Sequence, residues 1–207
     1  DVSMKKKVMK KISKDIYEVC DVFPRNVAEK IYSKFHKHSS ISWELIDQKK
    51  PTHYSTVFKN NSKFLPDKNE TYLAKFYRSD KLRNNPYIIN AIKKFVFPLM
   101  KTNLKFNIKE YDIRCHKFIK DNLTRLHFDN YAGAYAVTLN FNKIWKWDWG
   151  GILSVPVDNN YEKLLSILPK WNSLSIIYSG QNSSPHFVTS VQKFAKSARY
   201  SITIFIK

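Results

Sequence analysis

The sequence predicts an α+β protein that is mainly β, with a helical layer that precedes a β-barrel or β-sandwich. Two patterns predict this class. Up to residue 105 apolar residues recur at helical spacing, and beyond it they form short runs separated by polar turns. The 207 residues, 43% of them hydrophobic, suffice for one domain with a real core. We therefore expect a single domain over 1–207, in which 1–105 is mainly helical and 106–207 is the β core.

Two helices are expected in the first half. One begins at Pro24, because the apolar residues from Val27 to Phe35 recur at a spacing of four and form one buried face. The other begins at Asn85-Pro86, a capping residue followed by the residue favoured in the first helical turn. We expect Pro98 to end this second helix.

Residues 48–75, between the two helices, are rich in Lys, Asn, Ser and Pro and show no periodicity. Long segments of this kind run over the surface and often carry function. We expect a surface loop that acts as a lid.

The second half contains β-type runs of alternating or continuous apolar residues bounded by turn residues. So many short strands in about 100 residues indicate a sandwich or barrel, of which the jelly roll is one solution. The expected strands are 110–119, 123–128, 134–142, 151–156, 173–178, 185–191 and 198–206.

The net charge of +19 invites a nucleic-acid interpretation. However, 30 of the basic residues are Lys and only 6 are Arg, whereas bidentate recognition of phosphate favours Arg. An excess of Lys, Asn and Ile is also what a drift toward A- and T-rich codons produces. A nucleic-acid partner is therefore not favoured.

The expected location is cytoplasmic. No apolar run is long enough for a membrane span, and the basic N-terminus lacks the apolar stretch of a secretory signal. Cys20 and Cys115 cannot form a disulfide framework, which indicates a soluble protein of a reducing compartment. The oligomeric state is left open.

Three residues are candidate metal ligands. In His127-Phe128-Asp129 the imidazole and the carboxylate are two residues apart, so on a strand both leave the same face. His186, on a later strand, offers a second imidazole. Two His and one carboxylate on one face of a metal form the arrangement of non-haem Fe(II) oxygenases. Alone, the pair at 127 and 129 also fits an ordinary surface strand beside a turn.

The order of the motifs strengthens the metal interpretation and resembles a known family. After Asp129 come four segments: Thr138-Leu139-Asn140, Trp149-Gly150-Gly151-Ile152-Leu153, Pro185-His186-Phe187-Val188 and Arg199-Tyr200-Ser201-Ile202-Thr203. This order resembles the Fe(II)/2-oxoglutarate-dependent dioxygenases, and within them the prolyl hydroxylase branch, over residues 108–206. The resemblance implies a double-stranded β-helix, or jelly roll, with the N-terminal helices packed against it.

The resemblance also implies the site. His127, Asp129 and His186 would bind Fe(II), with O2 and 2-oxoglutarate as cosubstrates and ascorbate as a candidate reductant. Arg199 would pair with the distal carboxylate of 2-oxoglutarate, because a guanidinium grips a carboxylate bidentately. Ser201, on the same strand face, and Asn140, which stands where oxygen-sensing members carry a tyrosine, are further cosubstrate candidates. The 13-residue gap from His186 to Arg199 departs from the family pattern and indicates an enlarged hairpin at 192–197.

Three functions remain open. The favoured one is hydroxylation of a peptidyl residue, preferably proline, with release of succinate and CO2. A second is hydroxylation of a free amino acid or other small molecule, and a third is nucleic-acid binding or AlkB-like demethylation. AlkB-type enzymes carry a second arginine six residues after the first, whereas this chain has Phe205. Asp129 favours hydroxylation over halogenation, because related halogenases replace that carboxylate by a small residue.

Other conspicuous residues are interpreted as structural. The alternating tryptophans 145, 147 and 149 are expected on one side of an extended edge, as a hydrophobic flap rather than a base-stacking platform. The remaining histidines are expected to be surface or packing residues: His36, His38, His53 and His116.

Overall fold

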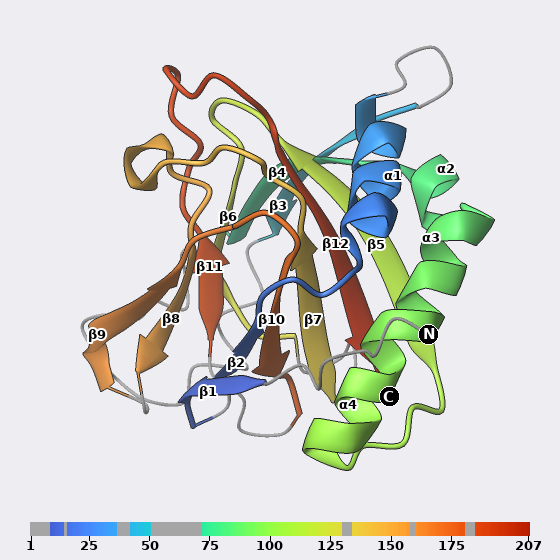
Figure 1. Cartoon of the computed structure of the whole chain (residues 1–207). Helices are drawn as coiled ribbons and strands as arrows, with labels where there is room; N and C mark the ends of the chain where they lie inside the picture. Colours follow the sequence, from blue (N-terminus) through green and yellow to red (C-terminus); the bar gives the residue numbers. More distant parts are fainter. Residues whose placement is uncertain are drawn as a thin grey trace.

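A computed structural model describes residues 9–14, 16–36, 42–50, 72–129, 134–157, 160–180 and 185–207. The predicted mainly β class is confirmed, because one curled, 12-stranded antiparallel sheet dominates the fold (Figure 1). The strands are β1 (Lys10–Ser13), β2 (Ile16–Val19), β3 (Glu44–Lys50), β4 (Tyr72–Arg78), β5 (Tyr111–Phe118), β6 (Leu123–His127), β7 (Tyr135–Asn140), β8 (Leu153–Val157), β9 (Asn160–Ile167), β10 (Ser173–Tyr178), β11 (His186–Val188) and β12 (Arg199–Ile206).

The helical elements are few and short. They are α1 (Arg25–His36), α2 (Asp80–Arg83), α3 (Pro86–Ala91), the π-helix η2 (Ile92–Val96), α4 (Phe97–Leu104) and the 3₁₀-helix η3 (Trp147–Trp149). Helices α1, α3 and α4 lie on the same side of the molecule as β12 and β5 (Figure 1).

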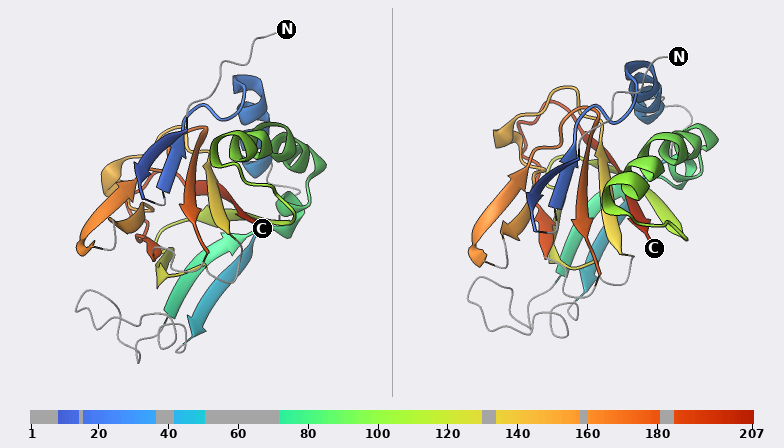
Figure 2. Two further views of the ribbon diagram at one scale, coloured as in Figure 1. Left: turned by 90° about the horizontal axis from the view of Figure 1, so that it is seen from below. Right: turned by 60° about the horizontal axis from the view of Figure 1, so that its bottom comes forward.

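The sheet runs in the order β1-β2-β10-β7-β12-β5-β4-β6-β11-β8-β9, and β3 pairs with β4. Strand β4 pairs with both β5 and β6, so it joins the two halves of a curled half-barrel. Seen from below, β3 and β4 extend past the other strands at one edge (Figure 2). The arrangement is consistent with the predicted jelly roll.

Alternation along the central strands separates an apolar face from a polar one. Ile202 and Ile204 of β12 belong to the largest buried cluster, and so do Ile31 and Phe35 of α1 and Ile88 of α3. The residues between them on the central strands point to the other face, where the register aligns polar side chains across four strands. One face of the sheet therefore holds the main core, and the other is free to line a site.

The second predicted helix continues beyond its expected end. Asn85 caps it as predicted, since its side chain accepts from the backbone N–H of Tyr87 and Ile88. Pro98, however, lies in the first turn of α4. A proline is tolerated there, because the backbone N–H that it lacks has no partner within the helix. The prediction that Pro98 ends the helix is wrong, because η2 reorganises the turn before it.

The first half of the chain contains more β structure than the sequence patterns indicate. Strands β1 to β4 all precede residue 105 and were not predicted. The ends of the predicted lid, at 48–50 and 72–75, belong to the paired strands β3 and β4. The rest of that segment, 51–71, lies outside the described residues, so the lid stays a prediction.

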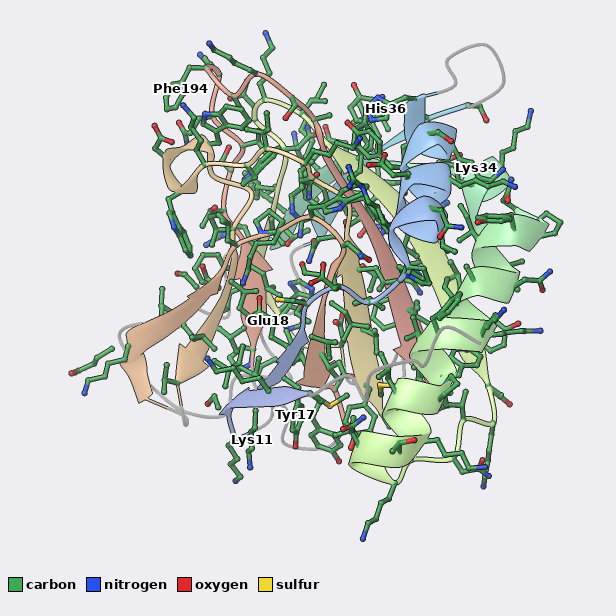
Figure 3. The ribbon with its side chains drawn as sticks, viewed as in Figure 1. Lys11, Tyr17, Glu18, Lys34, His36 and Phe194 are labelled. Atoms are coloured by element: carbon green, nitrogen blue, oxygen red, sulfur yellow. The ribbon has the colours of Figure 1, made fainter. Side chains whose placement is uncertain are left out.

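The three tryptophans do not share one side, which corrects that expectation. Trp145 and Trp149 are buried and pack edge to face at 5.4 Å, whereas Trp147 is 61% exposed. The 3₁₀ turn at η3 breaks the alternation of an extended strand. The predicted enlarged hairpin is a loop between β11 and β12, with Phe194 at its outer end (Figure 3).

Gly150 occupies a backbone conformation that other residues avoid, with φ 69° and ψ −153°. A Cβ built there would lie 1.9 Å from the carbonyl oxygen of Ser190. We expect Gly150→Ala to lower the free energy of unfolding by about 1–3 kcal/mol or more, measured by urea denaturation. Gly180→Ala is the comparison, because its Cβ would meet the side chain of Tyr178 and no backbone atom. Equal stability of the two variants would contradict this account.

Candidate active site

Neighbouring strands bring the three predicted metal ligands together. His127 ends β6 and lies directly opposite His186 of β11 in the register, and Asp129 follows two residues later. One ligand atom from each residue lies within 4.8 Å of the other two. The short spacing on one strand and the pairing of two strands therefore assemble a group able to hold a metal ion.

Hydrogen bonding orients the imidazole of His127. Its Nδ1 lies 2.8 Å from the carbonyl oxygen of Arg125, which can only accept, so Nδ1 carries the proton and Nε2 keeps its lone pair. That Nε2 is 3.6 Å from Asp129 Oδ1, and Nε2 of His186 is 3.1 Å from Asp129 Oδ2. Fixing the tautomer of a ligating histidine in this way is what metal sites require.

Asp129 is ionised in this setting. Burial alone would raise the pKa of Asp129, but the nearby charges and hydrogen bond of His186, the charge of His127 and that of the more distant Arg114 outweigh it and lower the pKa to about 2. Asp129 therefore offers an anionic donor at neutral pH, and the two imidazoles offer nitrogen donors once deprotonated, a set suited to a divalent transition metal.

The three residues lie in the wall of a cavity of about 420 Å³. Two polar rows of the inner sheet face run toward it: one row is His116, Ser201, Asn140 and Ser173, and the other is Arg114, Thr203, Thr138 and Ser175. A volume of this size is typical of a small-molecule site.

Arg199 lies in the same cavity wall and is 3% exposed. Its Nη1 donates to the hydroxyl of Ser201 at 3.1 Å, and its guanidinium lies 5.1 Å from the ring centre of Phe118. Among the described residues no carboxylate pairs with Arg199, and its Nε has no hydrogen-bond partner. Burial lowers the pKa of Arg199 to about 10, so it stays charged at neutral pH. A buried cation without a counter-ion suits an anionic ligand.

Asn140 and Ser201 share one row of the sheet, as their roles in the prediction require. Asn140 is 2% exposed, and its amide nitrogen lies 3.5 Å from the hydroxyl of Ser173. Its carbonyl oxygen has no partner among the described residues. The sequence analysis missed Arg78, Arg114 and His116, which also line the cavity. Alternation along β5 was the signal that could have found the last two, because Arg114, His116 and Phe118 leave one face.

His116 is half-buried and packs edge to face on Phe76 at 4.9 Å, as expected of a packing residue, and it also lines the cavity. Exclusion of water by the surrounding protein, together with the charges of Arg199, Arg114 and Arg78, lowers the pKa of His116 to about 3. Its Nδ1 lies 3.4 Å from the hydroxyl of Thr203. The imidazole is therefore neutral at physiological pH and adds no charge to the cavity.

The depressed pKa of His116 predicts a loss of stability in acid. An unfolded histidine binds a proton below about pH 6.5, whereas the folded one does so only near pH 3. The contribution of His116 to the free energy of unfolding is therefore fully present above pH 6.5. It decreases toward pH 4 by at most about 1.4 kcal/mol per pH unit. We expect His116→Gln to flatten the slope of unfolding free energy against pH in that window, measured by urea denaturation of metal-free protein. Asp129, whose pKa is about 2, contributes only below that window. Identical slopes for the two proteins would contradict the prediction.

A curled antiparallel sheet around a His-Asp-His group and a buried arginine is typical of the non-haem metal oxygenases. Residues 113–207 match the sequence model of the 2OG-Fe(II) oxygenase superfamily. This part of the chain is a 2OG-Fe(II) oxygenase domain, an oxidoreductase of the dioxygenase type, and the fold of the chain is prolyl hydroxylase-like. Membership of this family implies Fe(II), 2-oxoglutarate and O2.

Solved structures with a similar fold have low sequence identity to this chain. A prolyl-4-hydroxylase from Pseudomonas putida superposes with a TM-score of 0.63 at 11% identity, covering 93% of this chain and 92% of that one. A prolyl hydroxylase from Trichoplax adhaerens, in complex with a hypoxia inducible factor peptide fragment, superposes with a TM-score of 0.58 at 14% identity. The match covers 93% of this chain and 83% of that one. An oxidoreductase of the 2OG-Fe(II) oxygenase family from Burkholderia pseudomallei superposes with a TM-score of 0.55 at 15% identity, covering 93% of this chain and 85% of that one.

No curated protein sequence matches the chain. Among the described residues, no helix has the length and apolar character needed to cross a membrane.

Proposed function

We propose that this chain is an Fe(II)- and 2-oxoglutarate-dependent hydroxylase of a peptidyl residue, with proline favoured, and that it releases succinate and CO2. One observation carries the proposal: a cavity has a His-Asp-His group in its wall and, in the same wall, a buried arginine with no counter-ion among the residues that the structure describes. The two features suit a metal and a dicarboxylate in one site.

In this proposal His127, Asp129 and His186 hold Fe(II). Asp129 supplies the negative charge, and the hydrogen bond from His127 Nδ1 to the Arg125 carbonyl makes Nε2 the ligating nitrogen. When bound, Fe(II), 2-oxoglutarate and O2 supply the oxidation that inserts one oxygen atom into a substrate C–H bond. With only these three residues as ligands, the metal would have room to bind the cosubstrates as well.

Arg199 binds the distal carboxylate of 2-oxoglutarate in this proposal. The contact with Phe118 and the hydrogen bond to Ser201 hold the guanidinium of Arg199 in place, so its side chain needs little rearrangement to bind a carboxylate. Ser201 orients the guanidinium, whereas its row neighbour Asn140 is not among the residues that line the cavity and stays a candidate. Because His116 is neutral, it adds no further cation beside Arg199.

Support for a peptidyl substrate comes from the neighbours in fold. Two of the similar structures are prolyl hydroxylases, and one of them is in complex with a peptide fragment. The cavity is bordered by β3 and β4, through Ile46, Gln48 and Phe76. These paired strands contain the two ends of the segment predicted as the lid, and the lid itself stays a prediction.

The experiment is a succinate-release assay with Fe(II) and 2-oxoglutarate, screened against proline peptides, free amino acids and methylated oligonucleotides. Release stimulated by proline peptides and absent in Asp129→Asn supports the proposal. Stimulation by free amino acids alone supports the small-molecule alternative, and stimulation by oligonucleotides alone supports the AlkB-like one. Either of these outcomes overturns the peptidyl assignment.

Other expectations belong to the same proposal. A single dioxygenase domain over 1–207, with its helices packed against the jelly roll, is supported by the buried cluster shared by α1, α3 and the central strands. A cytoplasmic location and a role for ascorbate in keeping the iron reduced stay predictions.

A further inference from the structure

The cavity wall holds a second arginine that the proposed reaction does not use. Arg114, on β5, lines the same cavity as the His-Asp-His group, and its side chain is 35% exposed. We propose that Arg114 binds a carboxylate of the substrate, so that the preferred substrate carries a carboxylate besides the reacting group. This inference rests on the proposed function and adds the chemical class of the substrate.

Arg114 is held so that one edge of its guanidinium stays available. Its Nε lies 2.8 Å from Asp112 Oδ2, and its guanidinium carbon lies 4.5 Å from the ring centre of Phe205. Arg83 binds the other oxygen of Asp112 at 3.0 Å and so fixes that carboxylate. Among the described residues, the terminal nitrogens of Arg114 have no hydrogen-bond partner. A guanidinium fixed at Nε and packed on a ring presents its two Nη groups as a fork for one carboxylate.

The 2-oxoglutarate held by Arg199 is too short to reach Arg114 as well. Arg199 pairs with Phe118 in the register, whereas Arg114 pairs with Thr203, four residues further along β12. Four residues of a strand span about 13 Å. The guanidinium of Arg199 stays beside Phe118, and that of Arg114 lies over Phe205, further still from Arg199. The two carboxyl carbons of 2-oxoglutarate are joined by four bonds of about 1.5 Å each, so they lie at most about 6 Å apart.

The charges of the cavity also leave Arg114 as the cation available to a second ligand. The arginines in its wall are Arg78, Arg114 and Arg199, and Asp129 is the one carboxylate among the described lining residues. Arg78 is engaged by two carboxylates, with Glu44 at 3.3 Å and Asp80 at 3.6 Å. Asp129 is assigned to the metal and Arg199 to the cosubstrate. An incoming carboxylate therefore meets Arg114.

Two sources of this carboxylate share the same chemistry. It is either an acidic side chain beside the hydroxylated residue of a peptide or the α-carboxylate of a free amino acid. Binding of matched ligands separates these sources, where the anionic member of a pair carries the carboxylate and the neutral member carries an amide in its place. Suitable pairs are an acetylated, amidated Ala-Pro-Asp peptide with its Ala-Pro-Asn counterpart, and L-proline with L-prolinamide.

The experiment measures binding of each pair by calorimetry to protein loaded with Mn(II) and 2-oxoglutarate. In the unaltered protein we expect the anionic member of at least one pair to bind about 10- to 100-fold more tightly. Arg114→Gln should abolish that preference by weakening only the anionic member, and Arg114→Lys should retain part of it. Arg25→Gln removes an exposed charge on α1 and should leave the preference unchanged.

Other outcomes overturn the inference. These are equal binding or no binding of both members in both pairs, or a loss in Arg114→Gln that is the same for neutral and anionic members. A weaker 2-oxoglutarate affinity in Arg114→Gln would assign Arg114 to the cosubstrate instead. Succinate release with the neutral peptide alone would uphold the proposed hydroxylase and still refute the anionic substrate, so the two failures are distinguishable.

Discussion

Asp129→Asn is expected to remove stable metal binding and, with it, succinate release. Asparagine keeps the size of the side chain but lacks the charge, and the two imidazoles then face the metal without an anionic partner. Loss of a residue that merely supports a metal ligand costs about 10–100-fold in metal affinity, so loss of a ligand should cost more than about 100-fold. Metal content after gel filtration and titration with Mn(II) measure this effect.

The control for this prediction is Asp148→Asn, which removes an exposed carboxylate from η3. It should keep full metal content and activity. His127→Ala and His186→Ala should behave like Asp129→Asn, because each removes one of the three donors. Unchanged metal stoichiometry in Asp129→Asn or His127→Ala, with the fold intact by circular dichroism, would refute the metal assignment.

The β core is the part of the fold that the sequence predicted best. Its seven predicted strands correspond to β5 to β8 and β10 to β12, because Gly, Pro and Asn punctuate apolar runs there. Strand β9 was missed, since Glu162-Lys163 are exposed and Leu164 is 52% exposed, so its pattern is that of a solvated edge. Strands β1 and β2 escaped prediction for another reason. The pairing of β2 with β10 is a contact between residues about 160 apart in sequence, which local patterns do not encode.

The candidate site was only partly visible in the sequence. His127 and Asp129 were found because strand alternation fixes their common face, and His186 and Arg199 because their motifs occur in the order of a known family. Arg114 and His116 were not found, although alternation puts them on one face. Their relevance depends on the pairing of β5 with β12, which sets them opposite Thr203 and Ser201. Which strands pair is a property of the fold.

Arg199→Met is expected to weaken 2-oxoglutarate binding by about 2–5 kcal/mol, or roughly 30- to several-thousand-fold. The variant loses the charge that would pair with the distal carboxylate, while the long apolar side chain still fills the space beside Phe118. Calorimetric titration of Mn(II)-loaded protein with 2-oxoglutarate measures the loss. Arg25→Met, which changes an exposed arginine on α1, should bind as the unaltered protein does.

The same variant also tests why an arginine without a counter-ion is buried. Desolvation of Arg199 costs free energy in the ligand-free protein, and among the described residues no carboxylate offsets that cost. Arg199→Met should therefore be at least as stable as the unaltered protein without ligand. It should, however, lose the stabilisation that 2-oxoglutarate gives, which grows with the ratio of ligand concentration to Kd. Urea denaturation with and without 2-oxoglutarate compares the two. A variant destabilised without ligand, yet still stabilised normally by 2-oxoglutarate, would make Arg199 a structural residue and move the cosubstrate elsewhere in the cavity.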